Sequence, residues 1–446
     1  MRKAFLTPTE ILERVEPFVG GRTGLIGSSM ELPLTSGNPE VCVYSSYTAN
    51  LNQLSDDILI LSEDGLALSG AGSSTNRTLA RTKAFCEALE RYCTATFNGK
   101  DVIVATRDEL GESAVDLRLF ARGSAAEYQH PRNYLVAPSN QERMRWVQGY
   151  SLITGEPTWV PMAAVYLSSP FQYPGEAFTL PITTGCALAA SYEQATISGI
   201  CEVIERDALM LTWLQQLPLP QIDVSGCQDP GFWDRMARVE RAGIQQYFFD
   251  ATTDLGVSTV YALQIAPDSD LAVLVMAATR LDPAQAISKV IDEASSGRLA
   301  LEQLRKQPPP YDADDFYTFT TLTAGAIYYG DAGNMGAFDF LLNHEQKRPL
   351  AAMPNLATGN PETELDRLIS IFRRLNLDLY VVDITIPQLR DVGLYVVKVV
   401  APQLLPLATN YCMRYTAAPR LYEAPARMGH PVRDRAQLNP LPQPFA

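Results

Sequence analysis

The amino-acid sequence predicts an α+β (mixed α/β) fold in which two similar loop–helix modules surround one shared site. Each module is a stretch of small residues followed by a long apolar helix that carries the pattern Cys-Glu-x-x-Glu-Arg, at residues 86–91 and 201–206. The expected helices and antiparallel hairpins do not alternate strictly, which argues against a doubly wound parallel sheet. Hydrophobic residues make up 46% of the chain and charged residues 19%, a balance that supports a large buried core.

The N-terminal part predicts one short helix and then the first module. The helix is expected within residues 7–18, TPTEILERVEPF, with Thr9 as its cap. Residues 56–68 are expected to form a strand, a turn and an apolar segment. The Gly/Ser-rich residues 69–74 predict a loop before the first long helix, where backbone N–H groups and the helix dipole can hold phosphate. This loop lacks the G-K-[ST] ending of a P-loop, so alone it is more typical of helix capping.

Alternating and periodic apolar patterns predict the elements that follow. Residues 146–161 predict a β-hairpin that turns at Thr154-Gly155. Residues 257–278 predict two antiparallel strands, residues 284–304 a further helix, and residues 377–407 a strand, a loop and a second strand.

The expected domain organisation is simple. Residues 1–60 are expected to form an N-terminal segment that packs on the core, and residues 61–446 a single domain. The domain ends in a Pro-rich tail, residues 437–446, with polyproline character.

Charge and cysteine content exclude several classes of protein. A net charge of -14 argues against non-specific binding of nucleic acid and against docking on an anionic membrane. The seven cysteines include no C-x-x-C pair, so neither a disulfide framework nor a structural zinc site is expected. The sequence has no run of 18 apolar residues and no signal peptide, and we therefore expect a cytoplasmic protein.

The repeated pattern places two pairs of carboxylates on helices. Residues i and i+3 share a helix face, so Glu87 lies beside Glu90, and Glu202 beside Glu205. If the two helices face each other, four carboxylates gather, and their mutual repulsion requires a cation between them. No histidine lies near either pair in the sequence, which favours Mg²⁺ held together with phosphates over zinc or iron.

An arginine follows each pair of glutamates. Arg91 and Arg206 could each pair with a carboxylate of the other helix or reach a phosphate. The alternative is that both segments are ordinary amphipathic helices with surface glutamates and arginines. From the residues alone, the two interpretations remain about equally supported, because short motifs also arise by chance.

Taken together, these segments resemble the YcaO family over most of the chain. The hairpin at 146–161, the two Glu-x-x-Glu-Arg helices, and the segments RDALMLTW, EASSGRL and DITIPQLRDVGLYVVKVVAPQLLP are similar to family segments and occur in the expected order. The resemblance implies a YcaO-type ATP-binding fold with ATP and Mg²⁺ as cofactors. It assigns the binding of the metal ions to Glu87, Glu90, Glu202 and Glu205. The bound ions would then neutralise the charge of the phosphates during phosphoryl transfer.

The resemblance also implies a reaction on a ribosomally made precursor peptide. Azoline-forming members of the family convert Cys, Ser or Thr to thiazoline or oxazoline by phosphorylating the backbone amide oxygen. Such members tend to end in P-x-P-x-P, as residues 440–444 do here. The stiff tail is expected to hold the terminal carboxylate of Ala446 in the active site as a catalytic base.

Four positions depart from the family pattern, three before a glutamate pair and one after the second pair. Lys83 stands where a serine is usual and is expected to supply a phosphate contact. Ala190 and Gln194 replace an asparagine and a glutamate of the nucleotide site, and Lys398 replaces an arginine that contacts phosphate. The resemblance assigns nucleotide binding to Lys83, Arg91, Gln194, Arg206 and Lys398.

The resemblance implies partner proteins as well. The domain takes up the chain, so we expect a separate E1-like or leader-peptide-binding partner and a flavin-dependent azoline dehydrogenase, with this chain as a homodimer or as part of a hetero-oligomeric synthetase. Two alternatives stay open. One is thioamide or amidine formation, which the Pro-rich end disfavours; the other is a degenerate scaffold subunit, suggested by Ala190 and Gln194.

Overall fold

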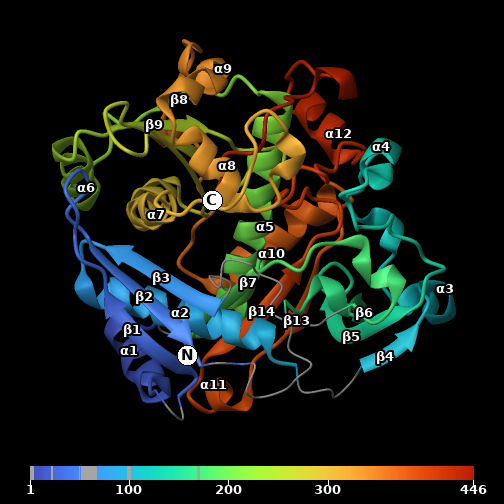
Figure 1. Ribbon diagram of the computed structural model, residues 1–446. Helices are drawn as coiled ribbons and strands as arrows, with labels where there is room; N and C mark the ends of the chain where they lie inside the picture. Colours follow the sequence, from blue (N-terminus) through green and yellow to red (C-terminus); the bar gives the residue numbers. More distant parts are fainter. Residues whose placement is uncertain are drawn as a thin grey trace.

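The structure is a computed structural model that describes residues 5–21, 24–49, 51, 68–97, 102–167 and 171–445. Within these residues the chain forms three β-sheets with helices packed on and between them (Figure 1), which confirms the predicted mixed fold. The strands are β1 (Ile26–Glu31), β2 (Cys42–Thr48), β3 (Ser69–Ser74), β4 (Val102–Ala105), β5 (Met144–Ser151), β6 (Pro157–Pro161), β7 (Cys186–Ala189), β8 (Gln221–Asp223), β9 (Gln245–Asp250), β10 (Thr259–Ile265), β11 (Val273–Thr279), β12 (Lys347–Pro349), β13 (Tyr380–Asp383) and β14 (Tyr395–Val400). The helices are α1 (Pro8–Val15), α2 (Arg77–Ala95), α3 (Arg107–Leu110), α4 (Ala125–Gln129), α5 (Tyr192–Gln215), α6 (Pro230–Arg241), α7 (Pro283–Leu304), α8 (Leu322–Tyr329), α9 (Asp339–Leu342), α10 (Pro361–Arg374), α11 (Pro387–Asp391) and α12 (Arg420–Arg427).

The three sheets have different strand orders. The first is β1-β2-β3, the second is β11-β10-β9-β8-β12, and the third is β4-β5-β13-β14-β7 with β6 paired to β5. Neighbouring strands are antiparallel except for β12, which runs parallel to β8. The last sheet joins strands from distant parts of the sequence, because β7 pairs with β14.

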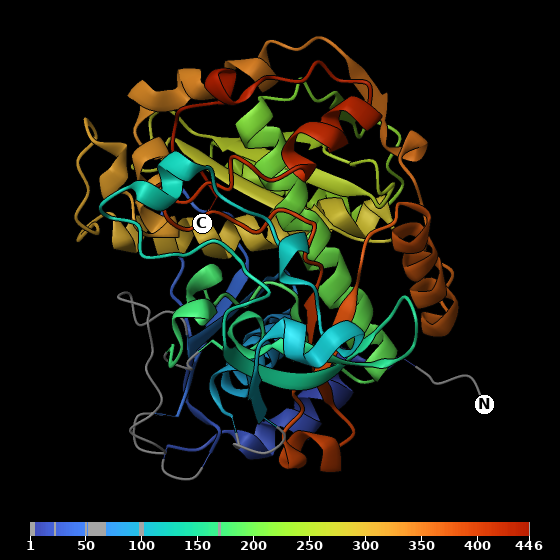
Figure 2. The same ribbon diagram turned by 90° about the vertical axis from the view of Figure 1, so that its right-hand side faces the viewer.

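Helix α5 connects the two halves of the molecule. In both views it runs from the half that contains β7, β13 and β14 into the half that contains β8 to β11 (Figures 1 and 2). It packs on β7 and β14 at one end and on β10, β11 and α12 further along. All but a few of its residues from Gly199 to Gln215 are buried, since it is surrounded by core on nearly every side. Its acidic residues therefore lie at the junction of the two halves.

Most of the sequence-based elements are confirmed. The hairpin expected at 146–161 is β5 and β6, and the antiparallel pair expected at 257–278 is β10 and β11. The helix expected at 284–304 is α7, and the segment 377–407 contains β13 and β14. The segment expected at 56–68 lies outside the described residues except for its last position, and the proposed division at residue 60 stays a prediction.

Two local predictions are wrong. The first helix is capped by Thr7, not Thr9, because Thr7 exchanges side-chain and backbone hydrogen bonds with Glu10 in a capping box. Residues 69–74 are the strand β3 and not a phosphate-binding loop. The glycines serve close packing: a methyl group at Gly70 or Gly72 would overlap backbone atoms of α2.

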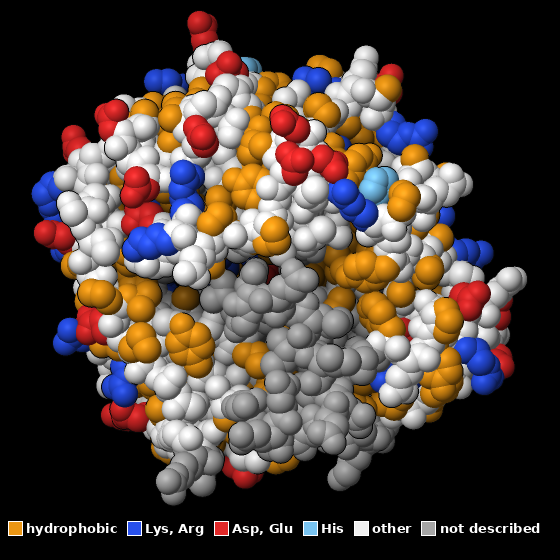
Figure 3. All heavy atoms as spheres, in the orientation of Figure 1, with side chains coloured by type: hydrophobic (Ala, Val, Ile, Leu, Met, Phe, Trp, Pro, Cys, Tyr) orange, Lys and Arg blue, Asp and Glu red, His pale blue; other side chains and the backbone are white. Residues whose placement is uncertain are grey.

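Two features of the whole molecule complete the fold. No helix among the described residues has the length and apolar character needed to cross a lipid bilayer. On the face shown in Figure 3, acidic and basic side chains are interspersed, with hydrophobic side chains scattered among them.

Candidate functional site

The first acidic pair lies on α2, between β3 and β7. Glu87 accepts a hydrogen bond from the backbone N–H of Ala71 at 2.7 Å and from Arg91 at 2.8 Å. Glu90 accepts one from the backbone N–H of Leu188 in β7, also at 2.7 Å. The two carboxylates thus leave the same helix face and attach to strands on either side of it, as the i, i+3 spacing predicts.

The second pair lies on α5. Glu202 accepts a hydrogen bond from the backbone N–H of Gly185 at 3.0 Å and contacts Arg206 at 3.3 Å. Gly185 has a φ of +85°, and a side chain there would overlap the carbonyl oxygen of Val399, so glycine is needed for this contact. Glu205 accepts from the backbone N–H of Thr279 at 3.0 Å.

Strand β7 brings the two pairs together. Both α2 and α5 pack against it, and Glu90 and Glu202 bind backbone N–H groups three residues apart, those of Leu188 and Gly185. Burial raises the pKa of Glu90 well above its ordinary value, the N–H of Leu188 opposes this rise, and the carboxylates of Glu87 and Glu202 add to it. Like charges therefore meet here, as predicted for facing helices.

The cations of the site are unevenly distributed. Glu205 is held by Lys289 at 3.3 Å and lies 3.5 Å from Arg206. Burial alone would raise the pKa of Glu205, but Lys289, Arg206 and Arg280 outweigh it, so the pKa lies below its ordinary value. On the Glu90 side, burial raises the pKa of Glu90 above its ordinary value and outweighs the lowering by Arg91, which pairs with Glu87 at 2.8 Å.

The residues present fit Mg²⁺ that is shared with a phosphate ligand. Among the described residues, no three His, Cys, Asp or Glu side chains are placed to hold a metal ion by themselves. Mg²⁺ usually takes one or two carboxylates and completes its octahedron with phosphate oxygens and water. The raised pKa of Glu90 marks the place where an added cation would relieve repulsion. One or two at a time of Glu87, Glu90, Glu202 and Glu205 would be its ligands, and the charge of Glu205 is already partly compensated by Lys289, Arg206 and Arg280.

Arg206 has groups ready for an oxyanion. Its Nη2 faces Glu202 and Glu205, whereas its Nε and Nη1 are buried and have no hydrogen-bond partner among the described residues. Buried donors without partners are costly, and an anionic ligand would satisfy them. The ring of Phe445 lies on the guanidinium, with 4.4 Å between the Arg206 Cζ and the ring centroid.

The tail brings Phe445 to this point. Trp213 and Tyr329 donate hydrogen bonds to the carbonyl oxygens of Leu441 and Pro442, at 3.2 and 2.8 Å. Phe445 forms a parallel β-bridge with Val275 in β11. The predicted polyproline tail is thus docked on α5, α8 and β11 as far as Phe445, while Ala446 lies outside the described residues.

Other predicted positions have their own partners. Lys83 donates to the carbonyl oxygen of Ser73 at 2.9 Å and forms an ion pair of 3.0 Å with the buried Asp292 on α7. Lys398 is buried and donates to the carbonyl oxygens of Ile182 and Thr184. Gln194 lies in the first turn of α5, where its backbone N–H is capped by Ser191.

Sequence reasoning missed the contribution of α7 and of the strand before it. Lys289 bridges Glu205 and Glu293, with 2.9 Å to the latter, and Arg280 adds positive charge nearby. The i, i+4 spacing of Lys289 and Glu293 was the available signal, but such pairs are common on exposed helix faces. Only the packing of α7 against β3 and β11 places Lys289 at the site.

The structure thus brings two pairs of carboxylates and their arginines to one strand of a mixed α/β fold. Comparison with known families is more specific. Residues 71–405 match the family described as YcaO cyclodehydratase, ATP- and Mg²⁺-binding. The chain belongs to the YcaO family, and the predicted ATP and Mg²⁺ are the cofactors described for that family.

Two curated relatives are similar to parts of the chain. An uncharacterized protein of Methanothermobacter thermautotrophicus is 30% identical over 242 residues, which are 53% of this chain and 58% of that protein. An uncharacterized protein in the tfuA 3' region of Rhizobium leguminosarum bv. trifolii is 30% identical over 121 residues, 26% of this chain and 28% of that protein. The chain thus spans less than two thirds of these curated relatives.

Solved structures share the fold. A heterocyclase in complex with substrate and cofactor has a TM-score of 0.76 at 21% identity, and the match covers 99% of this chain and 57% of the heterocyclase. YcaO from Methanopyrus kandleri, bound with AMPPCP and Mg²⁺, has a TM-score of 0.63 at 19% identity, and the match covers 90% of this chain and 91% of that protein. A chain of the E. coli microcin synthetase McbBCD complex with pro-MccB17 bound has a TM-score of 0.59 at 15% identity. The match covers 94% of this chain and 96% of that chain.

Proposed function

We propose that this protein is an ATP-dependent cyclodehydratase that forms azolines in a ribosomally made precursor peptide. The observation that carries the proposal is the pair of carboxylate sets on α2 and α5, joined through Gly185 and Leu188 at β7. Membership in a family described as ATP- and Mg²⁺-binding supports it. The docked Pro-rich tail favours azoline formation over the thioamide or amidine alternative.

The proposed reaction joins two bond-forming steps. The side-chain thiol or hydroxyl of a Cys, Ser or Thr gives up its proton to a base as it attacks the preceding backbone carbonyl carbon. The resulting oxyanion would attack the γ-phosphorus of ATP, so that ADP leaves. Loss of phosphate and of the amide proton then forms the C=N bond of the ring. The net change removes the elements of water from the peptide and converts ATP to ADP and phosphate.

The proposed role of each residue in the site depends on its charge. The carboxylates of Glu87, Glu90, Glu202 and Glu205 would hold the Mg²⁺ that neutralises the phosphates. Arg206, with its two unsatisfied donors, and Arg91 would bind phosphate oxygens, while Lys83 and Gln194 border the nucleotide. We further propose that the terminal carboxylate of Ala446 accepts the amide proton, since the tail is docked up to the preceding residue beside Arg206.

The proposed partners rest on the resemblance to azoline-forming members of the family. We propose a precursor peptide and a separate E1-like or leader-peptide-binding protein, with a flavin-dependent dehydrogenase that acts on the product. The McbBCD complex with its bound precursor supports a partner protein and a peptide substrate for this fold. A homodimer or a place in a larger synthetase is part of the same proposal.

A scaffold role is the second candidate, and one observation favours it. Lys289, Arg206 and Arg280 lower the pKa of Glu205 below its ordinary value, so the protein itself compensates this negative charge. A site that supplies its own cation could have lost its metal, and Ala190 and Gln194 fit such a loss. A scaffold would bind the partner protein without consuming ATP.

The experiment that separates the two uses the purified chain, its leader-binding partner and the precursor peptide. We expect the peptide to lose about 18 Da for each ring and one ADP to form per ring, measured by mass spectrometry and coupled ADP detection. Extending the chain by two glycines after Ala446 should stop peptide conversion but leave nucleotide binding intact. A wild-type chain that assembles with its partner as well as the Glu202→Gln variant does, while neither forms ADP or rings, would refute the enzyme in favour of the scaffold.

The contact between Phe445 and Arg206 gives a second prediction. Replacing Phe445 with leucine should raise the KM for ATP about tenfold, because the guanidinium loses a desolvated aromatic partner that fixes its orientation. Phe445→Tyr should keep the wild-type KM, since the ring is retained. Leu441→Ala is the matched control, because it trims the tail at a residue that packs on the core away from Arg206. If Leu441→Ala raises the KM as much as Phe445→Leu, the effect comes from general loosening of the tail.

A further inference from the structure

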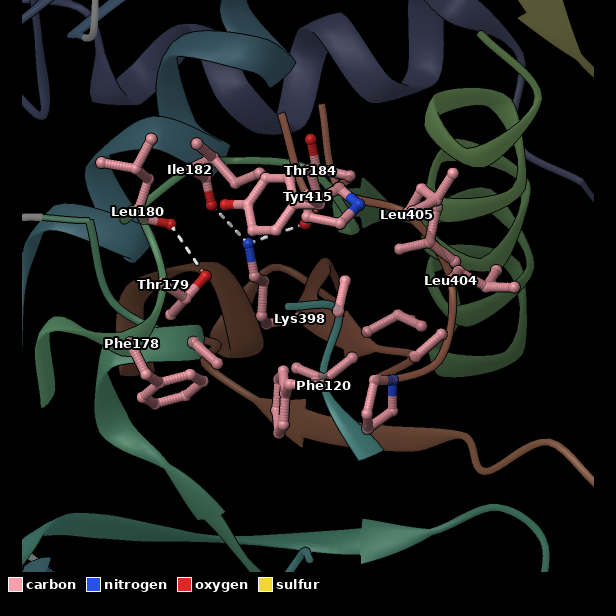
Figure 4. A pocket seen from close by; sticks show the side chains of 18 residues that line it. Phe120, Phe178, Thr179, Leu180, Ile182, Thr184, Lys398, Leu404, Leu405 and Tyr415 are labelled. Carbon is pink, nitrogen blue, oxygen red and sulfur yellow. Dashed lines mark hydrogen bonds between the residues drawn. The ribbon is translucent and has the colours of Figure 1, made fainter. Parts of the chain in front are cut away.

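A cavity of about 90 Å³ lies beside the acidic site and takes no part in the proposed role of the glutamates. Its walls come from the loop that precedes β7, from the end of β14 with the residues after it, and from α5. Most of the lining is apolar, and it includes Phe120, Phe178, Leu180, Leu404, Leu405 and Tyr415 (Figure 4).

One cation lies in this apolar lining. Lys398 is only 2% exposed, and its Nζ donates to the carbonyl oxygens of Ile182 and Thr184 at 2.5 and 2.7 Å. Figure 4 shows the ammonium group directed at these two carbonyls, among the side chains that line the cavity. An ammonium has three N–H donors, so one remains for an acceptor that enters the cavity. Its bonds to Ile182 and Thr184 make Lys398 a better candidate for a peptide carbonyl than for the phosphate contact expected from the sequence.

Two residues of the cavity wall are sequence neighbours of residues in the acidic site. Thr184 lines the cavity, and the next residue, Gly185, donates its N–H to Glu202 at 3.0 Å. Val203 also lines the cavity and follows Glu202 on α5. A group bound in the cavity therefore contacts Val203, the residue after Glu202 on the helix, and Thr184, the residue before the Gly185 that donates to Glu202.

Size limits what the cavity can accept. An apolar cavity of about 150 Å³ is known to hold a benzene molecule. A cavity of about 90 Å³ is smaller, so it suits a branched aliphatic side chain and is too small for an adenine or indole ring. The remaining Lys398 donor calls for a carbonyl oxygen attached to the same ligand.

We propose that this cavity is the subsite for an aliphatic residue of the peptide substrate, next to the residue that is cyclised. The side chain of valine, leucine or isoleucine fills the apolar cavity, and Lys398 donates a hydrogen bond to a backbone carbonyl of the same peptide. This inference rests on the proposed function, because it needs a peptide beside Glu202. It adds a preference at one substrate position, which the glutamates cannot provide.

The test uses short synthetic peptides and no nucleotide. The probes are acetylated, amidated tetrapeptides Gly-Xaa-Cys-Gly with glycine, valine, leucine or tryptophan as Xaa, and their binding to the full chain is followed by ligand-observed NMR. The leucine and valine peptides should bind about tenfold more tightly than the glycine peptide, the effect of burying one aliphatic side chain. The tryptophan peptide should bind no more tightly than the glycine peptide. Equal binding of the leucine and glycine peptides would overturn the proposal.

Variants locate the effect. Ala164 lines the cavity and is only partly buried, so Ala164→Phe should fill the space and remove the preference for leucine while Mg²⁺-dependent ATP binding stays unchanged. Ala125→Phe, on the exposed face of α4, is the matched control and should keep the preference. Leu180→Ala should shift the preference towards a larger side chain, which a merely destabilised protein would not show.

The Lys398 contact is tested separately. Lys398→Met should lower the affinity for every peptide by a similar factor and preserve the preference for leucine. Lys398→Arg should restore the affinity. Displacement of the leucine peptide by adenosine would assign the cavity to the nucleotide and refute the proposal. A chain that binds these peptides but never ATP would instead contradict the proposed function alone.

Discussion

Replacing Glu90 with glutamine is expected to stabilise the unliganded protein and at the same time to abolish its ATP consumption. Burial, with added repulsion from Glu87 and Glu202, raises the pKa of Glu90 above its ordinary value of 4.5. A neutral amide of the same shape removes this unfavourable charge, so the melting temperature should rise by a few degrees. The same change removes a proposed metal ligand, and kcat for ATP should fall about a hundredfold or more, as when one electrostatic group of an active site is lost.

The pH dependence fixes the sign of this effect. Because the folded protein binds the Glu90 proton more tightly than the unfolded chain, the stability it contributes is full below about pH 4.5 and is lost as the pH rises through the folded-state pKa. The stability advantage of Glu90→Gln should therefore be small near pH 4 and larger at pH 7, measured by thermal unfolding. Glu112→Gln is the control, since Glu112 is 97% exposed and should change neither stability nor activity. A variant that is less stable than the wild type at pH 7 would contradict the description of this site.

Replacing Arg420 with methionine is expected to cost about 3–5 kcal/mol of unfolding free energy, the usual cost of leaving a buried charge without its partner. Arg420 on α12 is 4% exposed and donates hydrogen bonds to two buried carboxylates: its Nε and Nη2 bind Asp207, with Nη2–Oδ2 at 2.7 Å, and its Nη1 binds Oδ2 of Asp254 at 2.9 Å. Asp207 follows Arg206 on α5 and is completely buried. The interaction therefore fixes α12 to the helix that carries the second acidic pair.

Arg427 offers a matched control for this prediction. It pairs with the same Asp254 at 3.0 Å, but its side chain is 38% exposed, so Arg427→Met should cost less than about 1 kcal/mol. Urea unfolding measures both variants. Combining Arg420→Met with Asp207→Leu should recover much of the loss, because no unpaired buried charge remains at Asp207. Equal losses for Arg420→Met and Arg427→Met would show that the buried network is not what anchors α12.

The sequence predicted what depends on local spacing. The i, i+3 positions of the glutamates and the alternation in residues 146–161 determine which side chains share a face, and the structure places them accordingly. The mixed fold was also predictable, since elements of both kinds are long and regular enough to show their periods. The Pro-rich tail was recognisable by composition, although its docking on Trp213 and Tyr329 was not.

What could not be predicted depends on long-range packing. Residues 69–74 contain small residues that suit a loop, and only contact with α2 shows that Gly70 and Gly72 form a closely packed strand. Lys289 reaches Glu205 across 84 positions in the sequence, and Phe445 reaches Arg206 across a still longer separation. Lys398 lies in a cavity wall because β14 pairs with β7, a pairing that no local pattern shows.

Calorimetric titration of ATP into the wild-type chain, with Mg²⁺ and then with a chelator, tests the central claim most directly. The claim is that the carboxylates of α2 and α5 hold Mg²⁺ on the phosphates of ATP. We expect saturable binding with Mg²⁺ and its loss in the chelator, because phosphates cannot approach this many carboxylates without a cation between them. ATP binding that is equally tight in the chelator, or absent under both conditions, would contradict it.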